Sequence, residues 1–311
     1  MKTILFKTII IAFFVGTAVS CSDEDENRFR PGSTHEKPNP TEPEGGLDYS
    51  KLTADNHPRL LMNAEAFTAL KAKVDANSSA NLTLLHNTIM GVCNSKGMNA
   101  TALTYKLDAS NKRILDVSRD ALLRIFTCAY AYRMTGDAKY LTKAETDMNA
   151  VCNFPDWNSK RHFLDVGEMA TAVAFGYDWL YNELTPEERR GFLGPMLKHV
   201  EHMQNPGYMR NGGGPETGNY GEPGLQLYAG LAAYGDGIDD ARAEKLLRNG
   251  YRLNTAMMNL RDEISGGSGL LTSICSGYSF GQYPWASYNF LHVLESAAGI
   301  DGTEHWTQMR D

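Results

Sequence analysis

The stretch ILDVSRDALLRIFTCAYAYRM (residues 114–134) is followed by TGD (135–137) and then by AKYLTKAETDMNAV (138–151). Apolar side chains recur every three or four residues on both sides of the TGD segment, which is typical of amphipathic helices. The glycine at the break is the residue that most commonly ends a helix. This stretch therefore predicts two antiparallel helices joined by a tight turn.

Helical periodicity continues through most of the chain. Further helices are expected at residues 166–181, 222–234, 241–260 and 283–298. The breaks near residues 136, 184 and 235 are spaced by about fifty residues, which corresponds to one antiparallel helix pair per unit. Convincing strands are few. We therefore expect an all-α fold of antiparallel helical hairpins, as in a helical array or an incomplete (α/α) toroid.

Two helix starts have clear sequence signals. Asn63 is an expected N-cap. The segment Thr185-Pro186-Glu187-Glu188 has the form of a capping box with proline at the first helical position.

The composition limits the possible classes of protein. The 311 residues are 42% hydrophobic and 22% charged, which is ordinary for a globular protein and excludes global disorder and a polytopic membrane protein. The formal net charge is −7, whereas non-specific nucleic-acid binders are usually basic because they must neutralise phosphates. No nucleic-acid partner is therefore expected.

The first twenty residues have the pattern of an export signal. Lys2 and Lys7 flank an apolar run, and Ala18-Val19-Ser20 directly precedes Cys21. Small residues before a cysteine resemble a bacterial lipobox, although its usual leucine is Ala18 here. We expect residues 1–20 to be a lipoprotein signal peptide and Cys21 to be lipidated, with an ordinary signal-peptidase site as the alternative.

Residues 21–47 are acidic at first and then rich in proline and glycine, which is typical of a flexible tether. The acidic cluster after Cys21 resembles the surface-export signal of some Gram-negative lipoproteins. We therefore expect an exported outer-membrane lipoprotein, with the membrane as a partner through the lipid anchor. Residues 48–311 are expected to form the folded domain.

Four further cysteines stand at positions 93, 128, 152 and 275. They form no C-x-x-C pair, and no histidine lies at metal-ligand spacing beside them, so no metal site and no cofactor are expected in this chain. Cys128 is expected in the core because an apolar run surrounds it. Disulfides are compatible with export, but the sequence determines no pairing.

Four motifs resemble the heparinase II/III-like polysaccharide lyases over roughly residues 50–300. They are HPRLLM at 57–62, FLDVGEMA at 163–170 with GYDWLY at 176–181, TGNYGE at 217–222, and SGYSFG at 276–281. The third corresponds to a family element that often reads Thr-Gly-His, with Glu three residues after the His. The fourth corresponds to the family element Gln-Gly-x-x-Tyr-Gly.

The resemblance implies an (α/α) toroid, which in the family precedes a β-sandwich and forms with it a cleft for an acidic polysaccharide. We expect no such sandwich within these 311 residues, and therefore neither the family's second catalytic histidine nor its structural zinc site. The expectation is therefore a truncated lyase or a toroid-only relative. The implied reaction is β-elimination at a uronic acid, which requires that the carboxylate be neutralised while the C5 proton is removed.

The motifs also imply catalytic roles. Glu222 takes the position that neutralises the substrate carboxylate. Asn219 stands where the family often has a catalytic histidine; it is no base, but it can donate a hydrogen bond to a carboxylate. Phe280 occupies the literal position of the catalytic tyrosine. The proton transfers are therefore assigned to Tyr278, with Tyr283 as the next choice.

Residues beside the loops are candidates for substrate binding. Arg210 and Arg161 are suited to bind acidic groups bidentately. Trp157 is a candidate for stacking on a sugar ring, and Tyr220 lies within the third motif.

Asp165 and Glu168, one helical turn apart, are expected to have structural roles, and Trp179 is expected in the core. Two other functions remain open. A toroid glycoside hydrolase would need two carboxylates about 5–9 Å apart in one cleft. A non-catalytic glycan-binding surface lipoprotein would need no proton-transferring tyrosine, and Asn219, Phe280 and the missing sandwich favour it.

Overall fold

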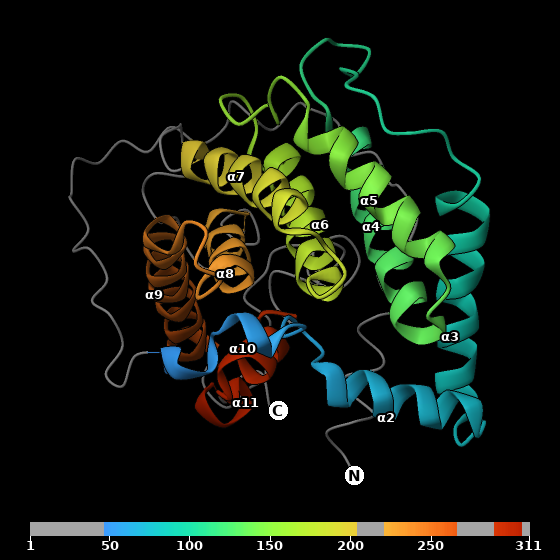
Figure 1. Cartoon of the computed structure of the whole chain (residues 1–311). Helices are drawn as coiled ribbons and strands as arrows, with labels where there is room; N and C mark the ends of the chain where they lie inside the picture. Colours follow the sequence, from blue (N-terminus) through green and yellow to red (C-terminus); the bar gives the residue numbers. More distant parts are fainter. Residues whose placement is uncertain (1–46, 204–220, 266–288, 307–311) are drawn as a thin grey trace, which may run out of the picture.

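The computed structural model describes residues 47–203, 221–265 and 289–306, and every regular element in these ranges is a helix (Figure 1). The all-α prediction is therefore confirmed for this part of the chain. The longer helices are α2 (Ala64–Asp75), α3 (Ala80–Val92), α4 (Leu115–Thr135), α5 (Ala138–Cys152), α6 (Phe163–Leu180), α7 (Pro186–Met203), α8 (Gly221–Ala233), α9 (Asp240–Ser265) and α10 (Phe290–Ala298). The shorter elements are η3 (Tyr49–Lys51), η4 (Ala54–Asn56), the π-helical turn η5 (Cys93–Gly97) and α11 (Gly302–His305).

The helix boundaries follow local chemistry that the sequence already indicated. The α4–α5 turn has Gly136 in the left-handed region (φ 71°), where glycine avoids the steric cost of a side chain. Asn63 caps α2 by accepting a hydrogen bond from the backbone N–H of Ala66 (2.9 Å). Thr185 and Glu188 form the predicted capping box, since each side chain accepts from the other residue's backbone N–H.

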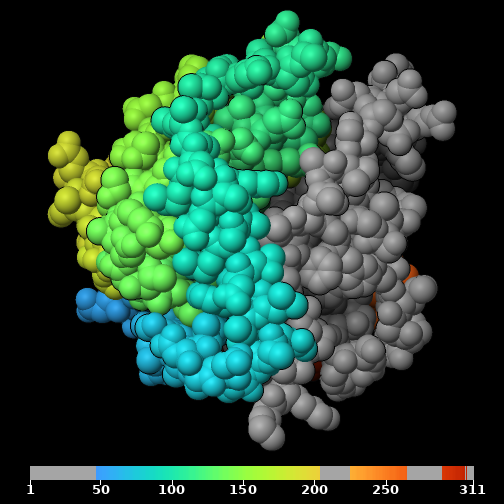
Figure 2. Space-filling view, turned by 90° about the vertical axis from the view of Figure 1, so that its right-hand side faces the viewer, coloured from blue at the N-terminus to red at the C-terminus, as the bar shows by residue number. Residues whose placement is uncertain are grey.

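The helices are arranged in two layers. α4 and α6 lie side by side and run in the same direction, because Ile114 meets Asp165 at their N-terminal ends and Phe126 meets Phe175 farther along. Phe175 also contacts Tyr228 of α8. Each of α5, α7 and α9 returns beside the helix that precedes it (Figure 1). On one flank, α2 and α3 cover part of this bundle (Figure 2).

Helix α6 forms the centre of the core. All of its residues except Leu164 are buried. Trp179 packs against Phe126, Phe175 and Phe67, with ring centroids 4.7–5.4 Å apart. The predicted core positions of Trp179 and Cys128 are confirmed, since both side chains are fully buried. Within the described ranges, no helix combines the length and apolar character needed to cross a bilayer.

Two glycines allow α8 and α9 to approach closely. A Cβ added to Gly230 would lie 2.5 Å from the backbone nitrogen of Leu247, and one added to Gly250 would lie 2.3 Å from that of Leu227. Backbone atoms cannot rotate away as a flexible side chain can. The α8–α9 contact therefore depends on the missing side chains at both positions.

Gly250→Ala is expected to lower the free energy of unfolding by about 1–3 kcal/mol, because the new methyl group overpacks a backbone contact. Gly191→Ala in α7 is the matched control, since nothing lies within 4 Å of a Cβ at that exposed helical position. There the change is expected to stabilise by about 0.5–1 kcal/mol, because alanine is the better helix former. Urea denaturation measures both, and equal effects of the two changes would contradict the close α8–α9 contact.

Candidate functional site

Two of the sequence motifs meet at the end of the bundle where α6 and α8 terminate. The carboxylate of Asp178 accepts hydrogen bonds from the backbone N–H groups of Arg59 (3.0 Å) and Leu60 (2.8 Å). It also lies 2.6 Å from His57 Nδ1. The indole N–H of Trp179 donates to the carbonyl of Leu60 (2.9 Å). The HPRLLM segment is thus fastened to the GYDWLY segment.

Arg59 extends this contact to α8. Its guanidinium donates to the carbonyls of Leu231 (2.7 Å), Ala232 (3.2 Å) and Tyr234 (2.8 Å), which lie at the C-terminal end of the helix. These carbonyls have no partner within the helix, and a cation suits the negative end of the helix dipole. The C-terminal ends of α6 and α8 are therefore held together.

Asp236, in the turn between α8 and α9, completes the cluster. Its two carboxylate oxygens contact His57 Nε2 (2.9 Å) and the hydroxyl of Tyr177 (2.7 Å). Burial, with the charge of Asp236 adding to it, raises the pKa of Tyr177 well above its usual range. We call His57, Arg59, Asp178 and Asp236 the Asp178 clamp. No substrate can reach it, because its side chains are at most 2% exposed, so we assign it a structural role.

The longer connections of the described bundle enter it at the opposite end. Residues 98–114 and 153–162 lead into α4 and α6, whereas short turns at 136–137, 181–185 and 234–239 follow the C-terminal ends of α4, α6 and α8. We call the N-terminal ends of α4, α6 and α8 the long-loop end. Because long loops on a rigid scaffold usually carry binding and catalytic groups, this end is the better place for a site.

Asp165 joins the helices at the long-loop end. It forms an ion pair with Arg113 (2.9 Å) and accepts from the backbone N–H of Ile114 (2.9 Å) and the side chain of Asn158 (2.7 Å). The carboxylate is fully buried and connects α4, α6 and the 153–162 connection. These contacts support the structural role expected from its sequence position.

Glu168 lies one turn farther along α6 and has a different environment. Its carboxylate is 3.3 Å from Arg119 Nε of α4, and the residue is only 4% exposed. Burial raises the pKa of Glu168 to about 7, despite the opposing effect of Arg119. The Arg119 side chain is 31% exposed. This pair therefore combines a carboxyl that titrates near neutral pH with a cation that reaches the surface, a combination common at sites of proton transfer.

Only part of the site predicted from the sequence lies within the described residues. Glu222 falls in the first turn of α8, which places its backbone at the long-loop end. Arg161 is exposed at the same end and donates to the carbonyl of Asn111 (3.2 Å), which joins two of the connections. The remaining predicted positions lie outside the described residues: Cys21, Arg210, Asn219, Tyr220, Tyr278 and Tyr283.

Trp157 requires a correction. Its ring is fully buried and stacks on His199, with centroids 4.7 Å apart. The indole N–H donates to the carbonyl of Val151 (2.8 Å). The 153–162 connection folds this side chain into the core. A sugar ring has no access to it, and we no longer consider it a substrate contact.

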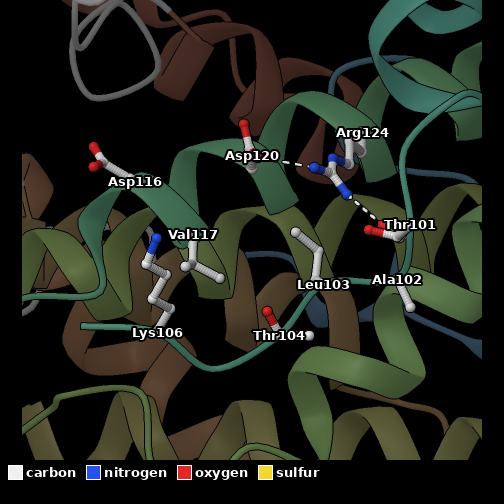
Figure 3. A pocket seen from close by; sticks show the side chains of 9 residues that line it. All are labelled: Thr101, Ala102, Leu103, Thr104, Lys106, Asp116, Val117, Asp120 and Arg124. Atoms are coloured by element: carbon white, nitrogen blue, oxygen red, sulfur yellow. Dashed lines mark hydrogen bonds and ion pairs between the residues drawn. The ribbon is translucent and has the colours of Figure 1, made fainter. Parts of the chain in front are cut away.

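One hollow was not predicted from the sequence. It has a volume of about 300 Å³ and lies between the 98–114 connection and α4 (Figure 3). Arg124 spans it, with bonds to Asp120 (2.9 Å) and to the carbonyl of Thr101 (2.9 Å). The lining residues are Thr101, Ala102, Leu103, Thr104, Lys106, Asp116, Val117, Asp120 and Arg124. Its charges are mixed, and it contains none of the residues predicted for the site.

Among the described residues, no group of three or more His, Cys, Asp or Glu side chains is placed to hold a metal ion.

The raised pKa of Glu168 predicts a pH dependence of stability. The folded protein keeps this proton up to about pH 7, whereas the unfolded chain loses it near 4.5. The free energy of unfolding should therefore fall between about pH 4.5 and 7, by roughly 3 kcal/mol at most from this residue. Glu168→Gln should remove this component, whereas Glu187→Gln, on the exposed start of α7, should retain it. Denaturation curves across this range would contradict the assignment if Glu168→Gln kept the full pH slope.

Comparisons with known proteins provide no family for the chain. No protein-family model matches it, and a search of curated proteins finds no match either. The functional interpretation therefore rests on the motifs and on the geometry described above.

Proposed function

We propose that this chain is the toroid domain of a heparinase II/III-like polysaccharide lyase, which cleaves uronic-acid-containing glycans by β-elimination. One observation carries the proposal: the HPRLLM and GYDWLY motifs, far apart in the sequence, form a single buried unit through Asp178. If the two motif matches had arisen by chance, nothing would require the two segments to be in contact in the folded chain.

The incomplete (α/α) toroid is part of the same proposal. The two layers of hairpins are the arrangement from which an (α/α) toroid is built, and we propose that they curve into an incomplete one. The substrate cleft would then lie at the long-loop end, where Glu222 and Arg161 are placed. The Asp178 clamp would hold the opposite end rigid.

The proposed reaction begins with the uronic-acid carboxylate held by Glu222, in its protonated form, and by Asn219. Tyr278, or Tyr283 in its place, takes the C5 proton as a phenolate. The C4–O bond breaks as the C4–C5 double bond forms, and the same tyrosine returns the proton to the departing oxygen. Arg210, Arg161 and Tyr220 bind the flanking acidic groups. No metal or cofactor of this chain takes part.

We also propose that the protein is exported and anchored in the outer membrane. The leader at residues 1–20 and the small residues before Cys21 support export and lipidation at Cys21. The protein would then act on glycans from the outer membrane, held there by residues 21–47.

A non-catalytic glycan-binding protein is the second candidate. Phe280 cannot transfer a proton, and Asn219 cannot act as a base, although they stand at two catalytic positions of the motifs. A chain with these residues would bind an acidic glycan without turning it over.

The test is to incubate the full chain with a panel of uronate polysaccharides, measuring binding by calorimetry and product by the ultraviolet absorbance of the unsaturated uronate. Activity should fall about 10²–10⁴-fold in Glu222→Gln and in whichever of Tyr278→Phe and Tyr283→Phe removes the proton-transferring hydroxyl, since each removes a group that acts in the transition state. Glu187→Gln should leave activity unchanged. Binding without product would favour the glycan-binding candidate, and neither binding nor product would overturn both.

A further inference from the structure

Two cysteines far apart in the sequence meet in the core. The sulfur atoms of Cys93 and Cys128 are 3.6 Å apart, and both residues are fully buried. Cys128 belongs to α4, and Cys93 follows the last residue of α3. Both are free thiols in this structure. A disulfide requires the sulfur atoms to approach to about 2.05 Å, a movement that side-chain rotation can supply at this separation.

The backbone around Cys93 adopts a conformation that allows the two sulfur atoms to approach each other. Residues Cys93–Gly97 form a π-helical turn, in which the N–H of Met98 donates to the carbonyl of Cys93 (2.8 Å). A Cβ added to Gly97 would lie 3.2 Å from the sulfur of Cys128 and 3.9 Å from that of Cys93. The absence of a side chain at Gly97 thus leaves the space that the two sulfur atoms occupy. π-helical turns are rare and often mark functional positions.

The two thiols differ in acidity. The hydrogen bond with Cys128 lowers the pKa of Cys93, whereas the same contact and burial raise the pKa of Cys128. Cys93 is therefore the better nucleophile, because the thiolate is the reactive form. Cys152 is different: burial raises its pKa, and its thiol donates to the carbonyl of Phe192 at 3.9 Å.

We propose that Cys93 and Cys128 are a disulfide-forming pair that links the end of α3 to α4 when the chain folds in the presence of a disulfide oxidant. The Cys93 thiolate attacks one sulfur of the oxidant, which is a small disulfide or the active-site disulfide of a thiol oxidase. This attack breaks the oxidant's S–S bond, releases its other sulfur as a thiol and leaves a mixed disulfide on Cys93. The Cys128 sulfur then attacks the Cys93 sulfur of the mixed disulfide and releases the second thiol. Overall the pair loses two protons and two electrons, and the oxidant's disulfide is reduced to two thiols.

The link would close a loop between residues 35 positions apart. Closing a loop of this size restricts the unfolded chain and should stabilise the fold. It would also fasten α2 and α3, which cover one flank of the bundle (Figure 2), to the core helix α4. This inference is independent of the proposed lyase activity.

The direct test is a peptide map of the full chain after refolding with oxidised glutathione, blocking of free thiols, and tryptic digestion without reductant. Cleavage after Lys73, Lys96, Arg124 and Arg133 places Cys93 and Cys128 in separate peptides, residues 74–96 and 125–133. The expected result is one species in which these two peptides are joined, lighter than their sum by two hydrogen atoms. Recovery of both peptides as blocked free thiols, or of Cys93 joined to Cys21, Cys152 or Cys275, would overturn the proposal.

A stability measurement gives a second readout. The thermal midpoint of the oxidised chain should fall by about 5–10 °C when reductant is added, as expected for loss of a loop-closing disulfide in a domain of this size. Cys152→Ser should retain this fall, whereas Cys93→Ala should abolish it. If Cys93→Ala does not fold, the comparison of wild type with Cys152→Ser still decides, because an unchanged midpoint in both would contradict the link.

Discussion

The carboxylate of Asp178 is the contact on which the arrangement of the helices depends. It receives two backbone N–H groups and the imidazole of His57 in a fully buried setting. A buried carboxylate is costly unless all of its partners are present, and removing a partner from such a network typically costs about 3–5 kcal/mol. Through Arg59, whose guanidinium binds the last carbonyls of α8, the same contact fixes two parallel helices at one end.

The Asp178 clamp holds the C-terminal ends of α6 and α8, and the site that we propose lies at the opposite, long-loop end. At the long-loop end, Asp165 is likewise a buried carboxylate whose hydrogen bonds join two helices, α4 and α6. Glu168, one turn away, is buried beside Arg119 and keeps a proton up to about pH 7. The two carboxylates differ in their partners: Asp165 has an ion pair and two further hydrogen bonds, whereas at Glu168 burial outweighs the effect of Arg119. The proposed catalytic residue Glu222 lies in the first turn of α8 at this same end.

Much of the fold could be predicted from the sequence because it is determined by local patterns. Apolar periodicity, the glycine at position 136 and the capping box at Thr185 depend on neighbours in the chain. What could not be predicted depends on residues brought together by folding. The burial of Trp157 comes from the path of its connection, and the pairing of Cys93 with Cys128 comes from a π-helical turn that sequence periodicity does not reveal. Most of the predicted catalytic residues lie outside the described ranges, so their grouping remains a prediction from motifs.

The central claim is that Asp178 holds the HPRLLM segment in place, and native-state hydrogen exchange tests it most directly. The backbone amides of Arg59 and Leu60 have the Asp178 carboxylate as their acceptor, although they lie outside any helix. In the native protein they should exchange as slowly as amides within α6, and in Asp178→Asn they should lose most of that protection before α6 does. Exchange of these two amides at the rate of an unstructured peptide in the native protein, or unchanged protection in Asp178→Asn, would contradict the claim.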